Sequence, residues 1–304
     1  MPLELRAISA EQLTALPITR TVFFFPVGPL GDHGPHLPMG LDLIEARALC
    51  EAAAQRLERE MPGWIGVIMP DSPLGVETNT TETGLRVRAH VLRDWLIDQC
   101  RCLKSTGFLH FVCFSGHAGP RQLTTIEEAG KALMRLRLWL PFLRTRGSVT
   151  FISASSALLP PKAVRRAPFW PDPLEHGGRR DTSVALHLNA SLSAEGYAKL
   201  PARARPASYF TRMWNRWTHK TNGYWGAPAD GSSKEGSEII SQSIEDVFPK
   251  MRAVWEGANP NALFRSWYSV LPPNQSLFRI WLLALVLLVI LWVWTVIAMR
   301  NLAF

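Results

Sequence analysis

TVFFFPV, residues 21–27, is a continuous apolar run that leads into the loop Gly28-Pro-Leu-Gly-Asp-His-Gly-Pro-His-Leu-Pro-Met-Gly40. An uninterrupted apolar run of this length, followed by glycine and proline, predicts a buried strand. The loop that follows it carries histidines and a carboxylate, and prolines stiffen it. The sequence therefore places a polar loop at the carboxyl end of a strand in the core.

The segments after this strand alternate between helix-like and strand-like patterns. Apolar residues recur at helical spacing in residues 42–60, 86–105, 123–138 and 234–255, and further strand-like runs occupy residues 64–69, 109–114 and 148–153. This order predicts an α/β fold in which a mostly parallel sheet has helices on both faces. Ligands of such folds bind in the loops at the carboxyl ends of the strands.

Composition narrows the class of protein. The chain has 304 residues, 47% of them hydrophobic, which is enough for a real core and argues against a disordered chain. Its four cysteines exclude a secreted disulfide scaffold. Residues 1–20 contain charges and no long apolar run, so we expect no secretory signal. The net charge of +8 indicates contact with something anionic.

The positive charge is concentrated in one irregular segment, residues 158–233, which is also rich in tryptophan. Between Lys162 and Lys220 there are 11 basic and four acidic residues. We expect this segment to contact lipid headgroups or an acidic partner, unless its arginines are simply solvated or paired internally. We expect no nucleic acid, because the segment precedes a membrane anchor and lipid explains its charge more simply.

The anchor is the uncharged stretch Ile280–Met299, which lies between Arg279 and Arg300. As a helix these residues would span about 30 Å, the thickness of the hydrocarbon core of a bilayer. We therefore divide the chain into an α/β domain (residues 1–257, including 158–233), a linker (258–278) and a C-terminal transmembrane helix (279–300). The prediction is a tail-anchored, single-pass membrane protein whose soluble domain is cytoplasmic and whose partners are the bilayer and a possible membrane-protein complex.

Three loops carry residues suited to chemistry. The first holds His33 and leads to Asp42, the second holds His117 between glycines, and the third is Glu175-His-Gly-Gly-Arg-Arg-Asp-Thr-Ser183. Imidazoles and carboxylates together are ligands that zinc, manganese and iron accept. Taken singly, each loop also fits an ordinary turn, a surface histidine or a helix cap.

The order of these motifs resembles the creatininase (creatinine amidohydrolase) family over about residues 18–256. The matching segments are His33-Gly-Pro-His-Leu-Pro with Asp42, Gly116-His-Ala-Gly119, His176-Gly-Gly-Arg-Arg-Asp-Thr-Ser183 and Gly223-Tyr-Trp-Gly-Ala-Pro228. The resemblance implies a homo-oligomeric α/β hydrolase that uses a divalent metal, and that acts on a cyclic amide or a related C–N bond.

By position, the resemblance assigns the metal ligands and the catalytic residue. The ligands are His33, Asp42, His117 and Asp181, and His176 is the acid or base next to the substrate. We assign Trp170 and Trp225, from the tryptophan-rich part of the chain, to substrate binding.

The chain also departs from the family pattern. Gly31 stands where the family has a glutamate ligand, and residues 76–84 lack the histidine that the family has there. We therefore expect one divalent ion (zinc, manganese or iron) rather than two. Two functions remain open: a membrane-anchored creatininase-like hydrolase, or a catalytically degenerate module that serves as a structural or interaction subunit of a membrane-protein complex.

Overall fold

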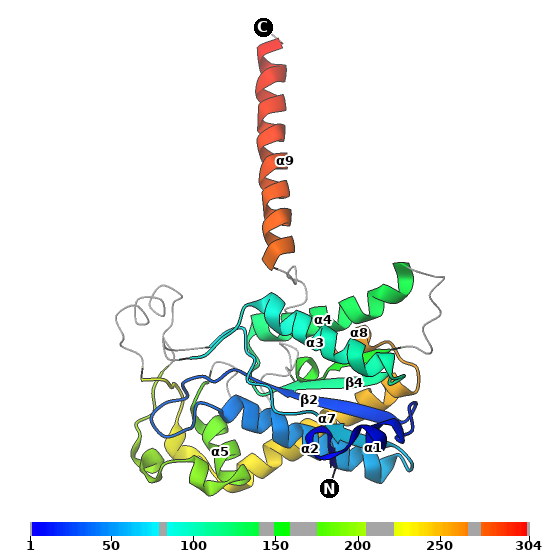
Figure 1. Cartoon of the computed structure of the whole chain (residues 1–304). Helices are drawn as coiled ribbons and strands as arrows, with labels where there is room; N and C mark the ends of the chain where they lie inside the picture. The colour runs from blue at the N-terminus through cyan, green and yellow to red at the C-terminus, as the bar shows by residue number, and fades with distance from the viewer. Residues whose placement is uncertain are drawn as a thin grey trace.

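The computed structural model describes residues 2–78, 84–139, 149–158, 175–204, 222–266 and 275–302. Within them lies one sheet of five parallel strands in the order β1-β3-β2-β4-β5 (Figure 1). The strands are β1 (Leu3–Glu4), β2 (Thr21–Val27), β3 (Ile65–Ile68), β4 (His110–Ser115) and β5 (Thr150–Ser153). The apolar run that opens the sequence is the central strand, β2.

The sheet is covered by helices on both faces because alternate side chains of β2 point in opposite directions. Val22 and Phe24 are fully buried in a core shared with α2 (Leu41–Glu60) and α7 (Ser233–Trp255). Phe23 and Phe25 are fully buried in a second core, shared with α3 (Ala89–Ser105) and α4 (Pro120–Trp139). The predicted α/β architecture, with a parallel sheet and helices on both faces, is confirmed.

The remaining elements are shorter or peripheral. They are α1 (Ala10–Thr14), α5 (Arg179–Leu188), α8 (Pro260–Leu263), α9 (Gln275–Leu302) and the 3₁₀ helices Leu5–Ala7, Ala154–Ala157, Ala190–Leu192, Glu195–Lys199 and Pro228–Asp230. Among these, α5 packs against α2 and α7. This contact brings the third motif of the sequence to the same side of the molecule as the first.

Four of the five strands agree with the sequence analysis, and β1 was not predicted. Two residues are too few for a periodic signal, so β1 is defined by its pairing, in which Leu3 lies beside Val67 of β3. A network around Arg47 of α2 also ties down this end of the chain, because its guanidinium contacts Glu4, Glu51 and Asp71.

Over the residues that the structure describes, no helix has both the length and the apolar character that crossing a bilayer requires. The predicted transmembrane helix at residues 279–300 is therefore not confirmed. The stretch does lie within a helix, α9, drawn in orange to red in Figure 1. Two parts of the basic segment 158–233, residues 159–174 (which include Trp170) and 205–221, lie outside the described residues. The division into domains stays a prediction.

Candidate metal centre

Three polar segments meet where parallel strands end. His33 lies in the loop after β2, Asp42 is in the first turn of α2, and His117 follows β4 by two residues. The carboxyl ends of β2 and β4 are neighbours in the sheet, where Val27 pairs with Ser115. Gly116 allows a closer approach still, because a Cβ at that position would overlap the backbone carbonyl of Asp42. The fold thus presses the His117 turn against the start of α2.

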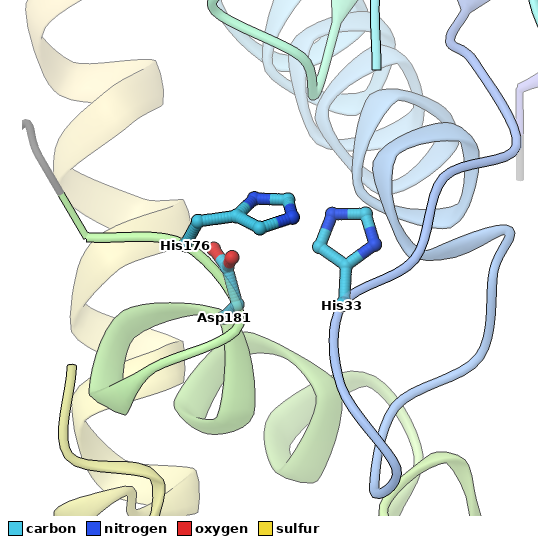
Figure 2. Close-up of side chains that lie close together, drawn as sticks. All are labelled: His33, His176 and Asp181. Carbon is cyan, nitrogen blue, oxygen red and sulfur yellow. The ribbon is translucent and has the colours of Figure 1, made fainter. Parts of the chain in front are cut away.

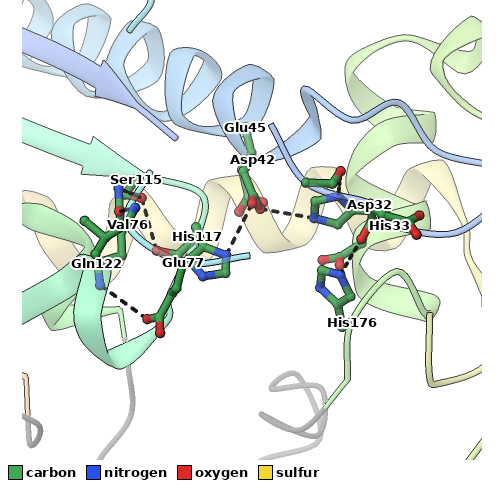
Figure 3. A network of polar contacts seen from close by, with 12 residues as sticks. Asp32, His33, Asp42, Glu45, Val76, Glu77, Ser115, His117, Gln122 and His176 are labelled. Atoms are coloured by element: carbon green, nitrogen blue, oxygen red, sulfur yellow. Dashed lines mark hydrogen bonds and ion pairs between the residues drawn. The ribbon is translucent and has the colours of Figure 1, made fainter. Parts of the chain in front are cut away.

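Asp42 lies between two histidines (Figure 3). Its Oδ1 is 3.3 Å from His33 Nε2, and its Oδ2 is 3.3 Å from His117 Nδ1. All three side chains are buried, with exposed fractions of 7% for Asp42, 2% for His33 and 3% for His117. His33 Nδ1 donates to the carbonyl of Gly31 at 3.0 Å, so Nε2 is the nitrogen that faces the carboxylate. A backbone acceptor of this kind commonly orients a metal-ligating histidine.

Burial and charge act in opposite directions on these groups. Burial acts to lower the pKa of His33, but the Asp42 carboxylate outweighs it and raises that pKa to about 9. Burial acts to raise the pKa of Asp42, yet the two histidines hold it well below its usual range. The pKa of His117 is raised in the same way, against burial, by Asp42 and by Glu77. The buried Asp42 carboxylate therefore stabilises positive charge on the histidine at each side of it. The same negative charge would favour a bound cation.

A second group overlaps the first at His33. His33, His176 and Asp181 each offer a ligand atom within 4.8 Å of the others, and their side chains converge in Figure 2. The rings of His33 and His176 lie 4.4 Å apart, centroid to centroid. Among the described residues, His33, His176 and Asp181 form the only set of three or more metal-ligating side chains that is compact enough to share one ion.

Asp181 is already engaged by its own helix. Its Oδ2 accepts from the backbone N–H of Gly177 at 2.7 Å, and its Oδ1 accepts from Arg180 at 3.1 Å. Arg180 in turn forms a two-pronged ion pair with Glu45 of α2, which is buried. Burial acts to raise the pKa of Asp181, but Arg180 and the neighbouring histidines lower it overall. The carboxylate is thus charged and partly neutralised before any metal binds.

His176 is held in one tautomer. Its Nε2 lies 2.7 Å from the backbone carbonyl of Asp32, which can only accept, so Nε2 carries the hydrogen. The ring lies 5.1 Å from that of Trp225, and the two residues pair through their backbones. Burial and the charge of His33 lower the pKa of His176 to about 4. His176 is therefore neutral at neutral pH, and Nδ1 is its basic nitrogen.

The residues that the sequence singled out are thus distributed over two overlapping groups. Asp42 contacts His33 and His117, whereas Asp181 is grouped with His33 and His176. Trp225 lies beside His176, and Trp170 is outside the described residues. The roles assigned to these residues stay predictions. His36 takes no part in either group, because its Nε2 contacts Thr182 Oγ1 at 2.9 Å.

Three further residues of the site were not predicted from the sequence: Glu45, Arg180 and Glu77. Glu45 follows Asp42 by three residues and shares its face of α2, so helical spacing could have indicated it. Arg180 directly precedes Asp181. In this motif the sequence analysis assigned roles only to the histidine and the carboxylate. Glu77 comes from a loop without periodicity, and only the fold brings it to His117.

The pKa of His33 predicts how metal binding depends on pH. Below about pH 9 the metal-free protein carries a proton on His33, and a ligating histidine must release that proton. The affinity for Zn²⁺ should therefore rise with pH from 6.5 to 8.5, by up to about tenfold per pH unit for one displaced proton. Competition with a chelator of known pH dependence measures this. A flat profile would show that His33 is not a ligand.

Gly31 provides a test of the missing carboxylate. A Cβ there would lie 3.7 Å from His33 Cε1 and 3.7 Å from Thr78 Cγ2, which is ordinary contact, and the backbone of Gly31 is not left-handed. Gly31→Glu should fold and raise the zinc content measured by elemental analysis, because it adds a carboxylate beside His33. Gly31→Gln has nearly the same shape and is the control. Equal metal content in the two variants would contradict the expectation.

Comparison with known proteins agrees with these motifs. The sequence profile of the creatininase family, described as creatinine amidohydrolase, matches residues 6–249. No curated protein matches the sequence closely enough to count as a relative.

Solved structures share the fold at low sequence identity. A structure named Creatininase Mn has 19% identity and a TM-score of 0.65, and the match covers 84% of this chain and 99% of that one. A structure of creatinine amidohydrolase (creatininase) has 18% identity and a TM-score of 0.64 over 84% and 99%. A putative creatinine amidohydrolase from Bacteroides fragilis has 17% identity and a TM-score of 0.58 over 84% and 97%. Because the family profile matches most of the sequence, the chain belongs to the creatininase family.

Proposed function

We propose that the protein is a metal-dependent hydrolase that acts on a cyclic amide or a related C–N bond. The observation that carries the proposal is the buried Asp42 carboxylate, flanked by His33 and His117 and next to the neutral His176. Membership of a family of creatinine amidohydrolases supports the reaction class. Similar structures include a manganese creatininase and a creatininase variant of the Zn-Zn type, which supports a divalent ion.

We place one ion at His33, because most donors gather there. Its Nε2 faces Asp42, and Asp181 lies within reach of the same ring, while His176 is kept free for proton transfer. Gly31 supplies no carboxylate, and Asp181 is already shared with Arg180, so the donor set is poor for a second ion. His117 contacts the other oxygen of Asp42, and we assign it to holding that carboxylate in place. Zinc, manganese and iron all accept imidazole and carboxylate, so the donors do not select among them.

A divalent ion in this position would lower the pKa of a bound water and polarise the amide carbonyl. The protein's own contribution to proton transfer lies in His176. With hydrogen fixed on Nε2 by Asp32, its Nδ1 takes up the proton of the attacking water and then delivers it to the leaving nitrogen. Trp225 beside this ring would form one wall for a flat substrate.

His33 and His36 form a matched pair for testing this proposal. Both lie in the loop after β2 and both are buried, but only His33 faces Asp42. His33→Ala should abolish Zn²⁺ and Mn²⁺ binding in titration calorimetry and any hydrolysis of cyclic amides such as creatinine. His36→Ala should keep metal binding, because the ring contacts Thr182 and Tyr224 and not Asp42. Wild-type protein that binds neither ion would contradict the hydrolase and leave the catalytically degenerate interaction subunit.

We also propose that α9 attaches the protein to a membrane, with the α/β domain on the cytoplasmic side. The support is the exposed apolar surface of this helix, where Leu287 is 63% exposed and Trp294 is 65% exposed. An apolar surface this extensive normally has a partner, and the uncharged stretch between Arg279 and Arg300 suits lipid. The expected homo-oligomer, a membrane-protein complex and the absence of nucleic acid stay predictions.

Removal of residues 276–304 tests the attachment. The full chain should stay with membranes through high-salt and alkaline extraction, because burial of apolar side chains does not depend on charge. The truncated chain should be released into the soluble fraction. Membrane retention of the truncated chain would place the attachment elsewhere, and release of the full chain by salt alone would contradict the role of α9.

A further inference from the structure

The two helical layers that cover the sheet differ in charge. Residues 86–139, which lead into α3 and end with α4, have nine basic and four acidic residues. On the opposite face of the sheet, α2, α5 and α7 together have eight basic and ten acidic residues. The two layers form separate cores on the two faces of β2 (Figure 1). These helices therefore give the α/β domain a positive side and a negative side.

The positive side has basic residues at both ends of α3 that reach solvent. Arg86 and Arg88 lead into the helix and are exposed, and they follow Leu85, which is 60% exposed. Arg101 and Cys102 are exposed near the end of the helix. We call these five residues the α3 surface. An exposed leucine beside arginines suits the boundary between lipid headgroups and acyl chains.

The acidic residues of α3 already have basic neighbours on the same helix. Asp94 lies 2.7 Å from Arg93, and Asp98 lies 3.8 Å from Arg101. The two carboxylates are therefore balanced locally by arginines within α3. The arginines that precede the helix are additional to these pairs, so the positive excess of the α3 surface remains.

The chain leaves the α/β domain on the same side. Ser266 is the last described residue before α9, and its backbone N–H donates to Glu127 of α4 at 2.7 Å. The connection from there to Gln275, the first residue of α9, can span at most about 30 Å. Figure 1 shows α3 and α4 on the side of the sheet from which α9 projects. A membrane that holds α9 is therefore nearer to the positive side than to the negative side.

We propose that the α3 surface rests on anionic lipid headgroups when α9 attaches the protein to a membrane. The inference rests on the proposed attachment by α9, but not on the metal centre. Negatively charged headgroups attract the arginines, and Leu85 enters the boundary below them. The side with α2, α5 and α7 then faces away from the bilayer, whose negative charge would repel it. The attachment thus gives the α/β domain a fixed orientation.

Cys102 allows a single label on the α3 surface. It is the exposed cysteine, whereas Cys50, Cys100 and Cys113 are buried. Full-length protein with a maleimide fluorophore on Cys102 is placed in nanodiscs of phosphatidylcholine and phosphatidylserine, about 7:3, that carry a quencher on a headgroup. The quencher should reduce the fluorescence strongly. Quenching should be weaker in pure phosphatidylcholine, and it should fall in about 0.5 M salt because salt screens the attraction.

Arg86→Gln combined with Arg88→Gln tests the charge. Both positions lie at the opposite end of α3 from Cys102, so the surroundings of the label stay the same. Loss of two arginines from an anionic surface should shift the equilibrium about 30-fold toward the undocked orientation and reduce the quenching. Arg59→Gln combined with Lys234→Gln is the matched control. It removes the same charge from exposed side chains of α2 and α7 and should leave the quenching unchanged.

The outcomes separate this inference from the proposals on which it rests. A full-length protein that stays in the discs but is quenched equally with and without phosphatidylserine has a merely solvated α3 surface, and the inference is overturned. Equal quenching in the two double variants would overturn it as well. A full-length protein that enters neither kind of disc contradicts the attachment by α9 and this orientation with it. The proposed hydrolase is tested by metal binding and is independent of all three results.

Discussion

The charge of Asp42 is the constraint on which the site depends. A carboxylate buried at the start of α2 is unfavourable unless positive charge or hydrogen bonds surround it, and removal of one partner from a buried pair typically costs about 3–5 kcal/mol. His33 and His117 supply that compensation from two different loops. The positions of both loops follow, since the ends of β2 and β4 must bring an imidazole to each oxygen of the same carboxylate.

Around this centre the chain uses charge pairs that its motifs do not reveal. Arg180 neutralises Glu45 and shares Asp181, so one guanidinium compensates two carboxylates, of which Glu45 is buried and Asp181 is partly buried. This arrangement keeps the start of α5 against α2. It also occupies carboxylate oxygens that could otherwise bind metal, and Gly31 provides none to replace them. A single ion at His33 is consistent with both features. Residues that neutralise one another inside the site thus limit how many cations it can hold.

The backbone contributes as much to the site as the side chains. The carbonyls of Gly31 and Asp32 fix the tautomers of His33 and His176, and the N–H of Gly177 fixes the carboxylate of Asp181. At Gly116 and Gly119 the absence of a Cβ is what lets the segments approach. The geometry of such a site depends on the path of the loop backbone. A substitution that shifts a loop would also shift the backbone atoms that orient the histidines and Asp181.

The sequence by itself determined the architecture, because a buried parallel strand such as residues 21–27 and the amphipathic helices around it have periodicities that are visible locally. It also singled out His33, Asp42, His117, His176 and Asp181 as candidates, because these residues match the motifs of one family. It did not reveal β1, whose two residues are defined only by pairing with β3. Nor did it show which side chains share a space: that Asp42 faces two histidines, that Arg180 engages Asp181, and that Glu77 and His117 both lie against Gly119. Those contacts join residues as far apart as 45 and 180, and only the packing of the strand ends and helix starts decides them.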